Sequence, residues 1–391
     1  MIRSWFLNIF IILLSGLLLI DIIGGYALAQ GEQTSVMVVY KGILALTISI
    51  FLTRIKSFWF FISPTIIFII LILFASFQSD SISNVGEKLA LFFRFVFNIV
   101  VFIFLVSQLK LENGFGKRIN FFIRFSFFVL VISILLGSFG IGNTTYSDSA
   151  VGSKGYFEGG NDIGVAFLVL GSYILFSLYL KKSSLMLRIS FIILFVFVAL
   201  LASTKLVIIG SLISIVFIQW HFTKQNVIIK YIYLSLLFGI LATGVYVGIQ
   251  FSGLMDRIIT NMDKGDLIFV LLSGRDNTVL EGFDIFGKST LITKFLGLSS
   301  IQNSEMDLFD ILLNFGFVGV LYFCSLALIQ MNELKKKINQ GYKNASFGRF
   351  IFILSGLLGL LAGHTFFSTQ GGLFLFSVVS MSYYTPRSYV K

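Results

Sequence analysis

The sequence is poor in the residues that most often bind metals or form disulfides. Its 391 residues include one cysteine, Cys324, and two histidines, His221 and His364. A single cysteine excludes a disulfide within the chain, and so few cysteines and histidines argue against a metal site built from them. The chain also lacks the G-x-S-x-G turn of serine hydrolases and the H-E-x-x-H helix of zinc proteases. Any chemistry must therefore use carboxylates and basic residues, and we expect neither a metal nor a cofactor.

Charge is scarce as well. Charged residues make up 12% of the chain and hydrophobic residues 57%, whereas soluble proteins have about 25% and about 45–50%. The missing charge indicates that most of the surface faces lipid, so we expect the lipid bilayer to be a partner. The net charge of +11 comes mainly from basic residues in short loops, and Lys335-Lys336-Lys337 is the one basic block. We therefore expect no nucleic acid partner.

Long apolar runs dominate what the sequence does contain. A membrane-spanning helix needs about 20 mostly apolar residues. The first run, which starts at Trp5, has no A-x-A cleavage site, so we expect a retained helix rather than a signal peptide. The short seventh and eighth runs meet at Ser203-Thr204-Lys205, as either a tight hairpin or one broken helix. We predict an all-α fold with twelve spans: residues 5–28, 36–53, 58–77, 87–109, 119–141, 162–180, 188–203, 206–221, 230–251, 309–331, 350–367 and 370–385.

Basic and acidic residues are sorted between the two sides of this arrangement. With the N-terminus inside and the spans alternating, inside segments carry 18 of the 29 basic residues and outside segments carry seven. Cytoplasmic loops are enriched in Lys and Arg, so we predict that both termini are cytoplasmic. Fifteen of the 18 acidic residues then lie outside, which indicates a polar, working outer face. We predict one integral membrane domain over residues 1–391, with a smaller outer loop at 142–162 and a large one at 252–308, between late helices.

Three cations are predicted at a similar depth near the outer surface. Lys41 and Arg94 lie five to seven residues inside their spans, about 8–10 Å deep, and Lys205 is at the turn between the short spans. A cation inside the bilayer costs about 2.5–3.5 kcal/mol or more. Each of them singly is compatible with snorkelling or with an ion pair to an acid such as Asp21. Their shared depth favours an anion site, such as one for a lipid pyrophosphate.

Carboxylates gather where the large outer loop enters the tenth span. If this segment is helical, Asp307, Asp310 and Asn314 share one face because they are spaced three and four residues apart. Carboxylates at this position can act as a general base or bind sugar hydroxyls. For Asp307 and Asp310, helix capping by acids that favour the helix dipole is an equal alternative. For Glu305 we favour a functional role.

Two further polar sites lie on the predicted outer face. Arg275 follows Ser273-Gly274 in the large loop, where a lone arginine is usually a solvated charge. His364 follows Gly363 near the outer end of the eleventh span, and in a helix it would share a face with Ser368. For His364 a structural hydrogen bond is favoured over catalysis.

These pieces, in this order, resemble the O-antigen polymerase and ligase superfamily, which includes the Wzy-type oligosaccharide repeat unit polymerases. Twelve spans and one large outer loop between late helices fit the same pattern. The resemblance implies a membrane-embedded, GT-C-like glycosyltransferase architecture in the bacterial cytoplasmic membrane. The motifs that carry it are Gly159-Gly160-Asn161-Asp162, Ser203-Thr204-Lys205, Ser273-Gly274-Arg275, Glu305-x-Asp307 followed by Gly316-x-x-Gly319, and Gly363-His364.

The resemblance also implies a reaction and its partners. Such polymerases move a growing glycan from one undecaprenyl pyrophosphate carrier to the sugar of another lipid-linked repeat unit, without a metal or a nucleotide at the outer face. A chain-length regulator is a candidate partner. We expect Glu305, Asp307 and Arg275 to be catalytic. We expect Lys205, Arg275, Arg94 and Lys41 to bind pyrophosphate, and Asn161, Asp162, Asp310 and His364 to bind sugar.

Three alternatives remain. A ligase of the same superfamily tends to carry a histidine near the end of the large loop, where this chain has Asn303-Ser304-Glu305, and that difference favours a polymerase. A flippase or other transporter for lipid-linked oligosaccharides should place charges near the bilayer midplane, but here the polar residues gather at the outer face. A structural membrane subunit would not need so many acids on that face.

Overall fold

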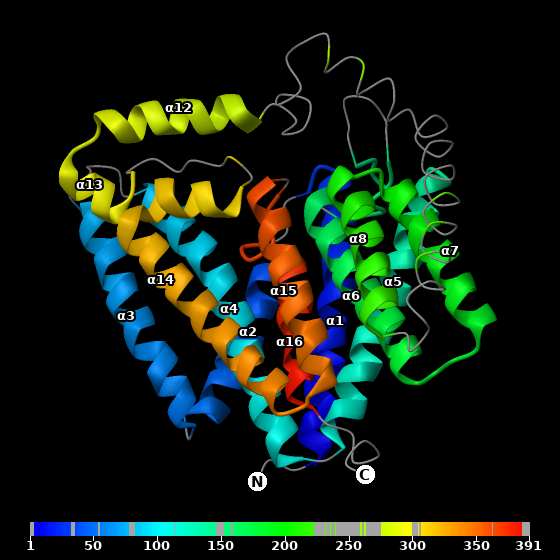
Figure 1. Cartoon of the computed structure of the whole chain (residues 1–391). Coiled ribbons are helices and arrows are strands. Elements are labelled where there is room, and N and C mark those ends of the chain that lie inside the picture. The colour runs from blue at the N-terminus through cyan, green and yellow to red at the C-terminus, as the bar shows by residue number, and fades with distance from the viewer. Residues whose placement is uncertain are drawn as a thin grey trace. The chain divides into compact units, whose positions relative to one another are not determined.

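The computed structural model of the chain describes residues 4–32, 36–53, 55–77, 83–112, 114–145, 152–157, 159–222, 275–298, 304, 306–361 and 363–384, with five isolated positions between 231 and 262. Over these residues the fold consists of helices and contains no strand (Figure 1). The helices are α1 (Ser4–Ala29), α2 (Val36–Leu52), α3 (Lys56–Phe77), α4 (Ser83–Leu111), α5 (Phe115–Ser138), α6 (Gly160–Leu180), α7 (Leu185–Ala202), α8 (Lys205–Phe222), α12 (Arg275–Lys288), α13 (Leu291–Leu296), α14 (Asp307–Asn339), α15 (Lys343–Leu361) and α16 (Gly371–Ser380), and the short 3₁₀ helix η2 (Met381–Tyr383) follows α16.

The helices confirm an all-α, multi-pass membrane protein. Within the described residues a helix lies at eleven of the twelve predicted spans. The ninth, 230–251, lies outside them apart from three isolated positions. In the described part of the chain α1, α4, α5, α6, α7, α8 and α14 are long and apolar enough to cross a membrane, and α2, α3 and α16 contain shorter apolar stretches. The count of twelve spans and the GT-C-like architecture stay predictions.

The structure corrects one predicted boundary and adds two helices within a predicted loop. The eleventh predicted span, 350–367, is instead the helix α15, which ends at Leu361. Residues 363–370 are not helical, so His364 and Ser368 do not share a helix face as predicted. The described part of the large outer loop, residues 275–298, is largely helical because it forms α12 and α13.

The chain divides into two compact units. Unit 1 comprises Met1–Gly42 and Glu112–Thr260, and unit 2 comprises Ile43–Leu111 and Asn261–Lys391. Each unit therefore combines an N-terminal segment with a later one. The single membrane domain predicted for the chain stays a prediction.

Unit 1 is organised around α6, whose residues from Ile163 to Tyr179 are all buried. Helices α5, α7 and α8 pack against it. Two glycines allow this close packing, because a Cβ on Gly164 would overlap Val207 and one on Gly171 would overlap the ring of Phe195. Helices α7 and α8 form the tight hairpin that was one of the two predicted alternatives, and Ser203 makes the turn with a left-handed φ of 54°.

The loop at 142–162, which is predicted to lie outside, is folded onto the ends of the helices in unit 1. Ser153 donates its backbone N–H to the Leu201 carbonyl (2.9 Å) and its hydroxyl to the Ile134 carbonyl (2.6 Å). Gly25 in α1 is so close to the Tyr156 carbonyl that a Cβ would overlap it. The described residues of this loop therefore form a cap over α1, α5 and α7.

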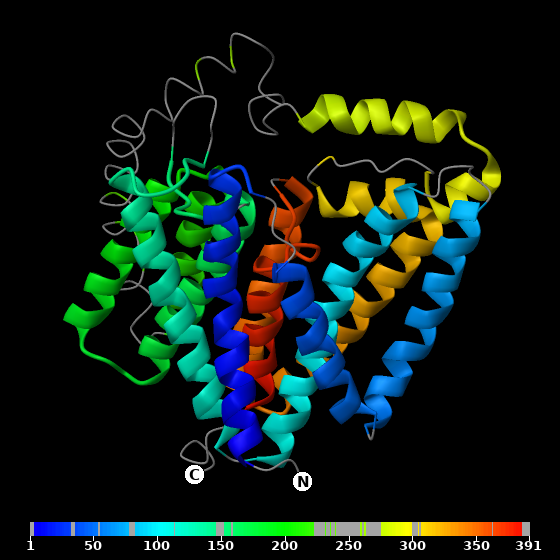
Figure 2. The same ribbon diagram turned by 180° about the vertical axis from the view of Figure 1, so that it is seen from behind.

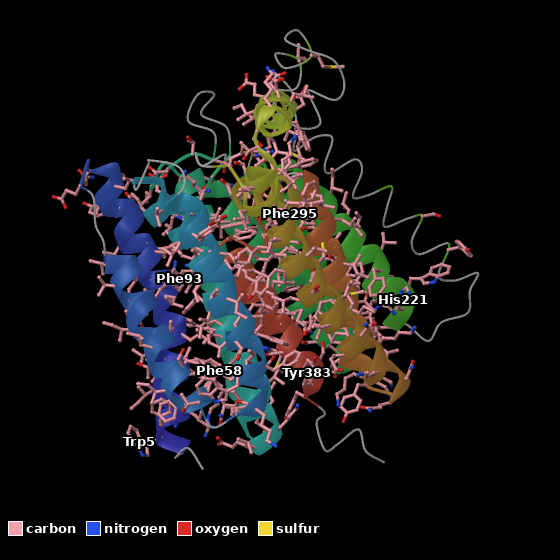
Figure 3. All side chains as sticks on the ribbon, turned by 90° about the vertical axis from the view of Figure 1, so that its left-hand side faces the viewer. Trp5, Phe58, Phe93, His221, Phe295 and Tyr383 are labelled. Carbon is pink, nitrogen blue, oxygen red and sulfur yellow. The ribbon has the colours of Figure 1, made fainter. Side chains whose placement is uncertain are left out.

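Unit 2 has an aromatic core shared by α3, α4 and α14. Phe68 stacks on Tyr322 with ring centroids 4.9 Å apart, and the Tyr322 hydroxyl lies 2.8 Å from the Thr65 hydroxyl. Phe323 extends the core to Phe367, 5.0 Å away between centroids. Phe295 and Tyr383 lie toward opposite ends of the unit (Figure 3). This packed layer supports the polar residues described next.

Helix α12 lies across one end of unit 2, over α13 and the start of α14 (Figure 2). Gly282 brings it against Leu313, and Phe283 and Phe286 contact rings on α14. Arg275 is the first residue of α12 and is partly buried. The long loop thus places a helix, rather than an irregular segment, next to the aspartates of α14.

Candidate functional site

A break in α14 positions its first segment. Gly316 has φ 63° and ψ −163°, which is outside the helical region, so residues 307–315 form a separate segment that lies across the end of the unit (Figure 1). A Cβ at Gly316 would overlap the Phe295 carbonyl, and a positive φ disfavours other residues as well. The sequence predicted a helix here but not its interruption.

The loop after α13 holds this break in place. Leu298 donates its N–H to the Leu313 carbonyl (2.7 Å), and the ammonium of Lys88 in α4 donates to the Leu298 carbonyl. Lys88 is buried, and the carbonyl satisfies only one of its donors. A basic side chain inside the unit therefore fixes the loop against the turn in α14.

The predicted polar face of this segment is confirmed and is turned inward. Asp307, Asp310 and Asn314 are 3%, 1% and 1% exposed. Met306 occupies the N-cap position and makes no side-chain capping bond. Asp307 accepts hydrogen bonds from the backbone of Thr365 and Phe366, and Asp310 accepts them from Ser304. A favourable interaction with the helix dipole alone therefore does not account for the two aspartates.

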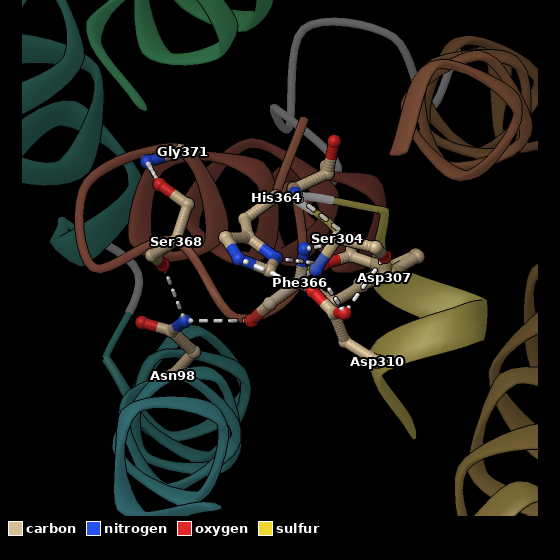
Figure 4. A network of polar contacts seen from close by, with 9 residues as sticks. Asn98, Ser304, Asp307, Asp310, His364, Phe366, Ser368 and Gly371 are labelled. Carbon is tan, nitrogen blue, oxygen red and sulfur yellow. Dashed lines mark hydrogen bonds and ion pairs between the residues drawn. The ribbon is translucent and has the colours of Figure 1, made fainter. Parts of the chain in front are cut away.

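His364 lies between the two aspartates (Figure 4). Its Nδ1 is 3.1 Å from Asp307 Oδ1, and its Nε2 is 3.5 Å from Asp310 Oδ2. The other Asp307 oxygen accepts the backbone N–H groups of Thr365 and Phe366, both at 2.8 Å. Asp307 thus fixes both the imidazole and the backbone that carries it.

Asp310 is held from the other side by Ser304. The backbone N–H and the hydroxyl of Ser304 both donate to Asp310 Oδ1, each at 2.7 Å. This leaves Oδ2 directed to His364, where it is buried. We call Asp307, Asp310 and His364 the Asp–His–Asp cluster.

The cluster is suited to moving a proton. A neutral imidazole has one N–H and can donate to only one carboxylate. A second proton, on the imidazole or on Asp310, is needed for both contacts to be favourable. His364 is the most accessible member, with 17% of its side chain exposed against 5% for Asp307 and 2% for Asp310. The arrangement is therefore a histidine that two carboxylates orient and whose charge they balance.

Asn98 supports the loop that carries His364. It is fully buried in α4, and its Nδ2 donates to the carbonyls of Ser368 (3.1 Å) and Phe366 (3.3 Å) (Figure 4). The Ser368 hydroxyl in turn accepts the N–H of Gly371 at the start of α16 (2.7 Å). The sequence did not identify Asn98, because an isolated asparagine in an apolar run carries no signal of its partner.

The other predicted site residues are spread over the two units. In unit 2, Arg94 is exposed on α4, Arg275 opens α12, and Glu305 lies outside the described residues. In unit 1, Lys41 lies in α2. Asn161 and Asp162 form the first turn of α6, and Lys205 opens α8 next to it, since Gly164 abuts Thr204. The structure therefore joins Asp307 with Asp310 and His364, and brings Lys205 near Asn161 and Asp162.

One match to a nucleotide-binding pattern lies in the large loop. Residues 282–289, GFDIFGKS, fit the G-x-x-x-x-G-K-[ST] pattern of a P-loop, which wraps phosphate with loop backbone N–H groups ahead of a helix. Here most of the segment is the second half of α12, and the Lys288 ammonium is paired with Asp284 at 2.5 Å. This helical geometry does not form a phosphate-binding loop.

No group of three or more His, Cys, Asp or Glu side chains that could hold a metal occurs in the described ranges. Comparison of the chain with protein-family models, curated proteins and solved structures finds no match. The interpretation of the site therefore depends on its geometry.

Proposed function

We propose that the protein is a membrane glycosyltransferase, a surface polysaccharide polymerase of the O-antigen type. It would join oligosaccharide repeat units carried on undecaprenyl pyrophosphate at the outer face of the bacterial cytoplasmic membrane. The observation that carries the proposal is the buried Asp–His–Asp cluster at one end of a multi-pass helical unit. The order of sequence motifs supports the choice of substrate.

In the proposed reaction an acceptor sugar hydroxyl attacks the anomeric carbon of the donor. A new C–O bond forms, the bond from this carbon to the pyrophosphate breaks, and the pyrophosphate leaves with the electron pair. In the base form His364 is neutral and donates its Nδ1–H to Asp307, so its unprotonated Nε2 accepts the hydroxyl proton. Asp307 orients the ring and stabilises the positive charge that results. Asp310 contacts the other ring nitrogen.

Basic residues would balance the leaving charge. Arg275 and Arg94, which belong to the same unit as the cluster, are the candidates for this role, because positive groups near a departing pyrophosphate lower the barrier. Lys205 and Lys41 belong to unit 1 and stay predictions from the sequence. Asn161 and Asp162 are candidates for holding sugar hydroxyls at the start of α6. Glu305 remains an alternative base because it adjoins Ser304, which positions Asp310.

A gene deletion in the native host tests the function. Polymerase activity predicts that the surface polysaccharide ladder on a gel disappears while a single repeat unit still reaches its anchor. Loss of all repeats, with polymer still building on the lipid carrier, would identify a ligase. An unchanged ladder would reject the glycan proposal.

A histidine pair tests the site. We expect His364→Gln, expressed in the deletion strain, to lower polymer formation by at least about 100-fold, because general base catalysis contributes about 10²–10⁴. His221→Gln is the matched control, since His221 is exposed on α8 and stacks on Phe217 4.1 Å away. Normal ladders from His364→Gln at equal protein level would exclude the proposed base.

A transporter is the second candidate, and one observation favours it. Interrupted helices and protonatable residues inside the membrane are features of secondary transporters, and α14 is interrupted at Gly316. A flippase for lipid-linked oligosaccharides predicts that, in the deletion strain, repeat units accumulate on the cytoplasmic side. Accessibility of these units to an added sugar-oxidising reagent in intact cells separates this outcome from polymerase loss.

A further inference from the structure

Basic side chains gather where three helices of unit 1 end. Arg124 is in the first half of α5, Lys181 follows the last residue of α6, and Arg188 is in the first turns of α7. Arg188 is already engaged: it donates to the Ser183 carbonyl at 2.6 and 2.9 Å, and its guanidinium lies 4.8 Å from the centre of the Tyr179 ring. Arg124 and Lys181 are the two cations for which a balancing negative charge must be found.

Arg124 belongs to α5 and Lys181 directly follows α6, and these two helices pack against each other. Partial burial lowers the pKa of the Lys181 ammonium, and the positive charge of Arg124 lowers it further. The Arg124 Nε is buried without a hydrogen-bond partner, whereas Lys181 is exposed. Two positive charges therefore lie at the corner of unit 1 formed by the first half of α5 and the end of α6. One of them, Arg124, also has an N–H donor without a partner.

Within the part of the chain that the structure describes, neither Arg124 nor Lys181 forms an ion pair with a carboxylate. The sequence has no Asp or Glu at 113–147 or at 163–255. Glu112, just before α5, is paired with Arg118 at 2.5 Å. Among the helices that pack against α5 and α6, the remaining acids are Asp21 in α1 and Asp162 in α6. Both lie toward the opposite ends of these helices, where the outer loop caps them.

The helix dipole explains part of this arrangement. A lysine directly after a helix favourably meets the negative end of the dipole, which accounts for Lys181. It does not account for Arg124, which lies nine residues inside α5 and so beyond the first turn, where the dipole acts. An ionisable residue inside a membrane span usually has a partner or a function.

We propose that Arg124 and Lys181 bind the phosphate of an anionic phospholipid in the leaflet that meets this corner of unit 1. The charge bias of the loops predicts that this is the cytoplasmic leaflet. Exposed apolar side chains flank the corner and would contact the acyl chains: Phe121, Leu185 and Met186 are 62%, 56% and 79% exposed. Basic sites between helices on the cytoplasmic side are typical binding sites for anionic lipid head groups. The inference is independent of the proposed enzymatic activity.

The experiment measures lipid binding to the purified full-length protein. Native mass spectrometry after titration with phosphatidylglycerol should show one lipid retained at lower concentration than phosphatidylcholine. Each cation near the membrane surface contributes about a fivefold change in affinity. We expect Lys181→Gln to weaken phosphatidylglycerol binding about fivefold and Arg124→Gln/Lys181→Gln about 25-fold, with phosphatidylcholine unaffected.

Arg118→Gln is the matched control. It removes the same charge from the same helix, but Arg118 is already paired with Glu112, so phosphatidylglycerol binding should not change. Equal binding of both lipids by the unmodified protein, or full binding by the double variant, would overturn the proposal. If the double variant does not fold, the single Lys181→Gln variant decides, because Lys181 is exposed and substitution of an exposed residue usually changes stability little.

Discussion

At the scale of single residues, the site depends on which side chains meet rather than on which are present. Asp307, Asp310 and His364 were each identified from the sequence, but their meeting was not. Asp307 and His364 are 57 positions apart, and no periodic pattern links them. His364 was expected to make a structural hydrogen bond in preference to catalysis. Its place between two buried carboxylates is compatible with a structural hydrogen bond and with a catalytic role.

Asn98 provides a prediction at this scale. Replacing Asn98 with Leu leaves the Phe366 and Ser368 carbonyls without their donor inside the unit. We expect a loss of about 1–3 kcal/mol in stability, the cost of unpaired buried groups. We also expect at least about a tenfold loss of polymer, because the loop bearing His364 is released. Thermal unfolding in detergent and the polysaccharide ladder measure the two effects.

Ser107→Ala is the control for Asn98. Ser107 is on the same helix and bonds only its own backbone and a neighbouring side chain, so both readouts should stay near their original values. If Asn98→Leu retains full activity while losing stability, Asn98 is structural and does not position His364.

At the scale of elements, helix length was easier to predict than helix interruption. Apolar runs predicted the helices because a membrane-spanning helix needs a minimum length of apolar sequence. The break at Gly316 could not be predicted, since glycine is common in membrane helices. It results from close contact with Phe295 and Gly297, which belong to α13 and the loop after it.

The break yields a prediction for α14. Gly316→Ala would place a Cβ into the Phe295 carbonyl at a positive φ. We expect a loss of about 1–3 kcal/mol in stability, the usual cost of strained backbone, and loss of the polysaccharide ladder because the segment that bears Asp307 is displaced. Unfolding temperature and polymer yield measure the outcome.

Gly86→Ala tests whether this effect is specific. A Cβ at Gly86 in α4 has no neighbour within 4 Å, and Ala is favoured over Gly inside a helix. This variant should be as stable as the original protein or more so. Equal behaviour of the two variants would mean that the break at Gly316 does not hold the aspartates.

At the scale of the whole molecule, charge bias predicts how the chain crosses the membrane. The predicted topology places the α12 end of unit 2 outside and the loop between α14 and α15 inside. Cys324 is the only cysteine, so Cys324→Ser supplies a cysteine-free background. We expect a membrane-impermeant maleimide to label Asn277→Cys in intact cells but to label Lys335→Cys only after lysis. Both positions are exposed, so the reverse pattern would invert the predicted orientation of this unit.

The sequence by itself determined the class of protein and the approximate positions of the described apolar helices, but not α12 and α13. Both follow from local composition: apolar length selects membrane helices, and scarcity of charge excludes a water-exposed surface. Only the tertiary structure decided that His364 lies between Asp307 and Asp310, that Asn98 and Lys88 hold the loops around them, and that GFDIFGKS is mostly helical. These features arise from contacts between distant segments, and the free energy that selects such contacts comes from packing and burial in the folded chain rather than from any local pattern.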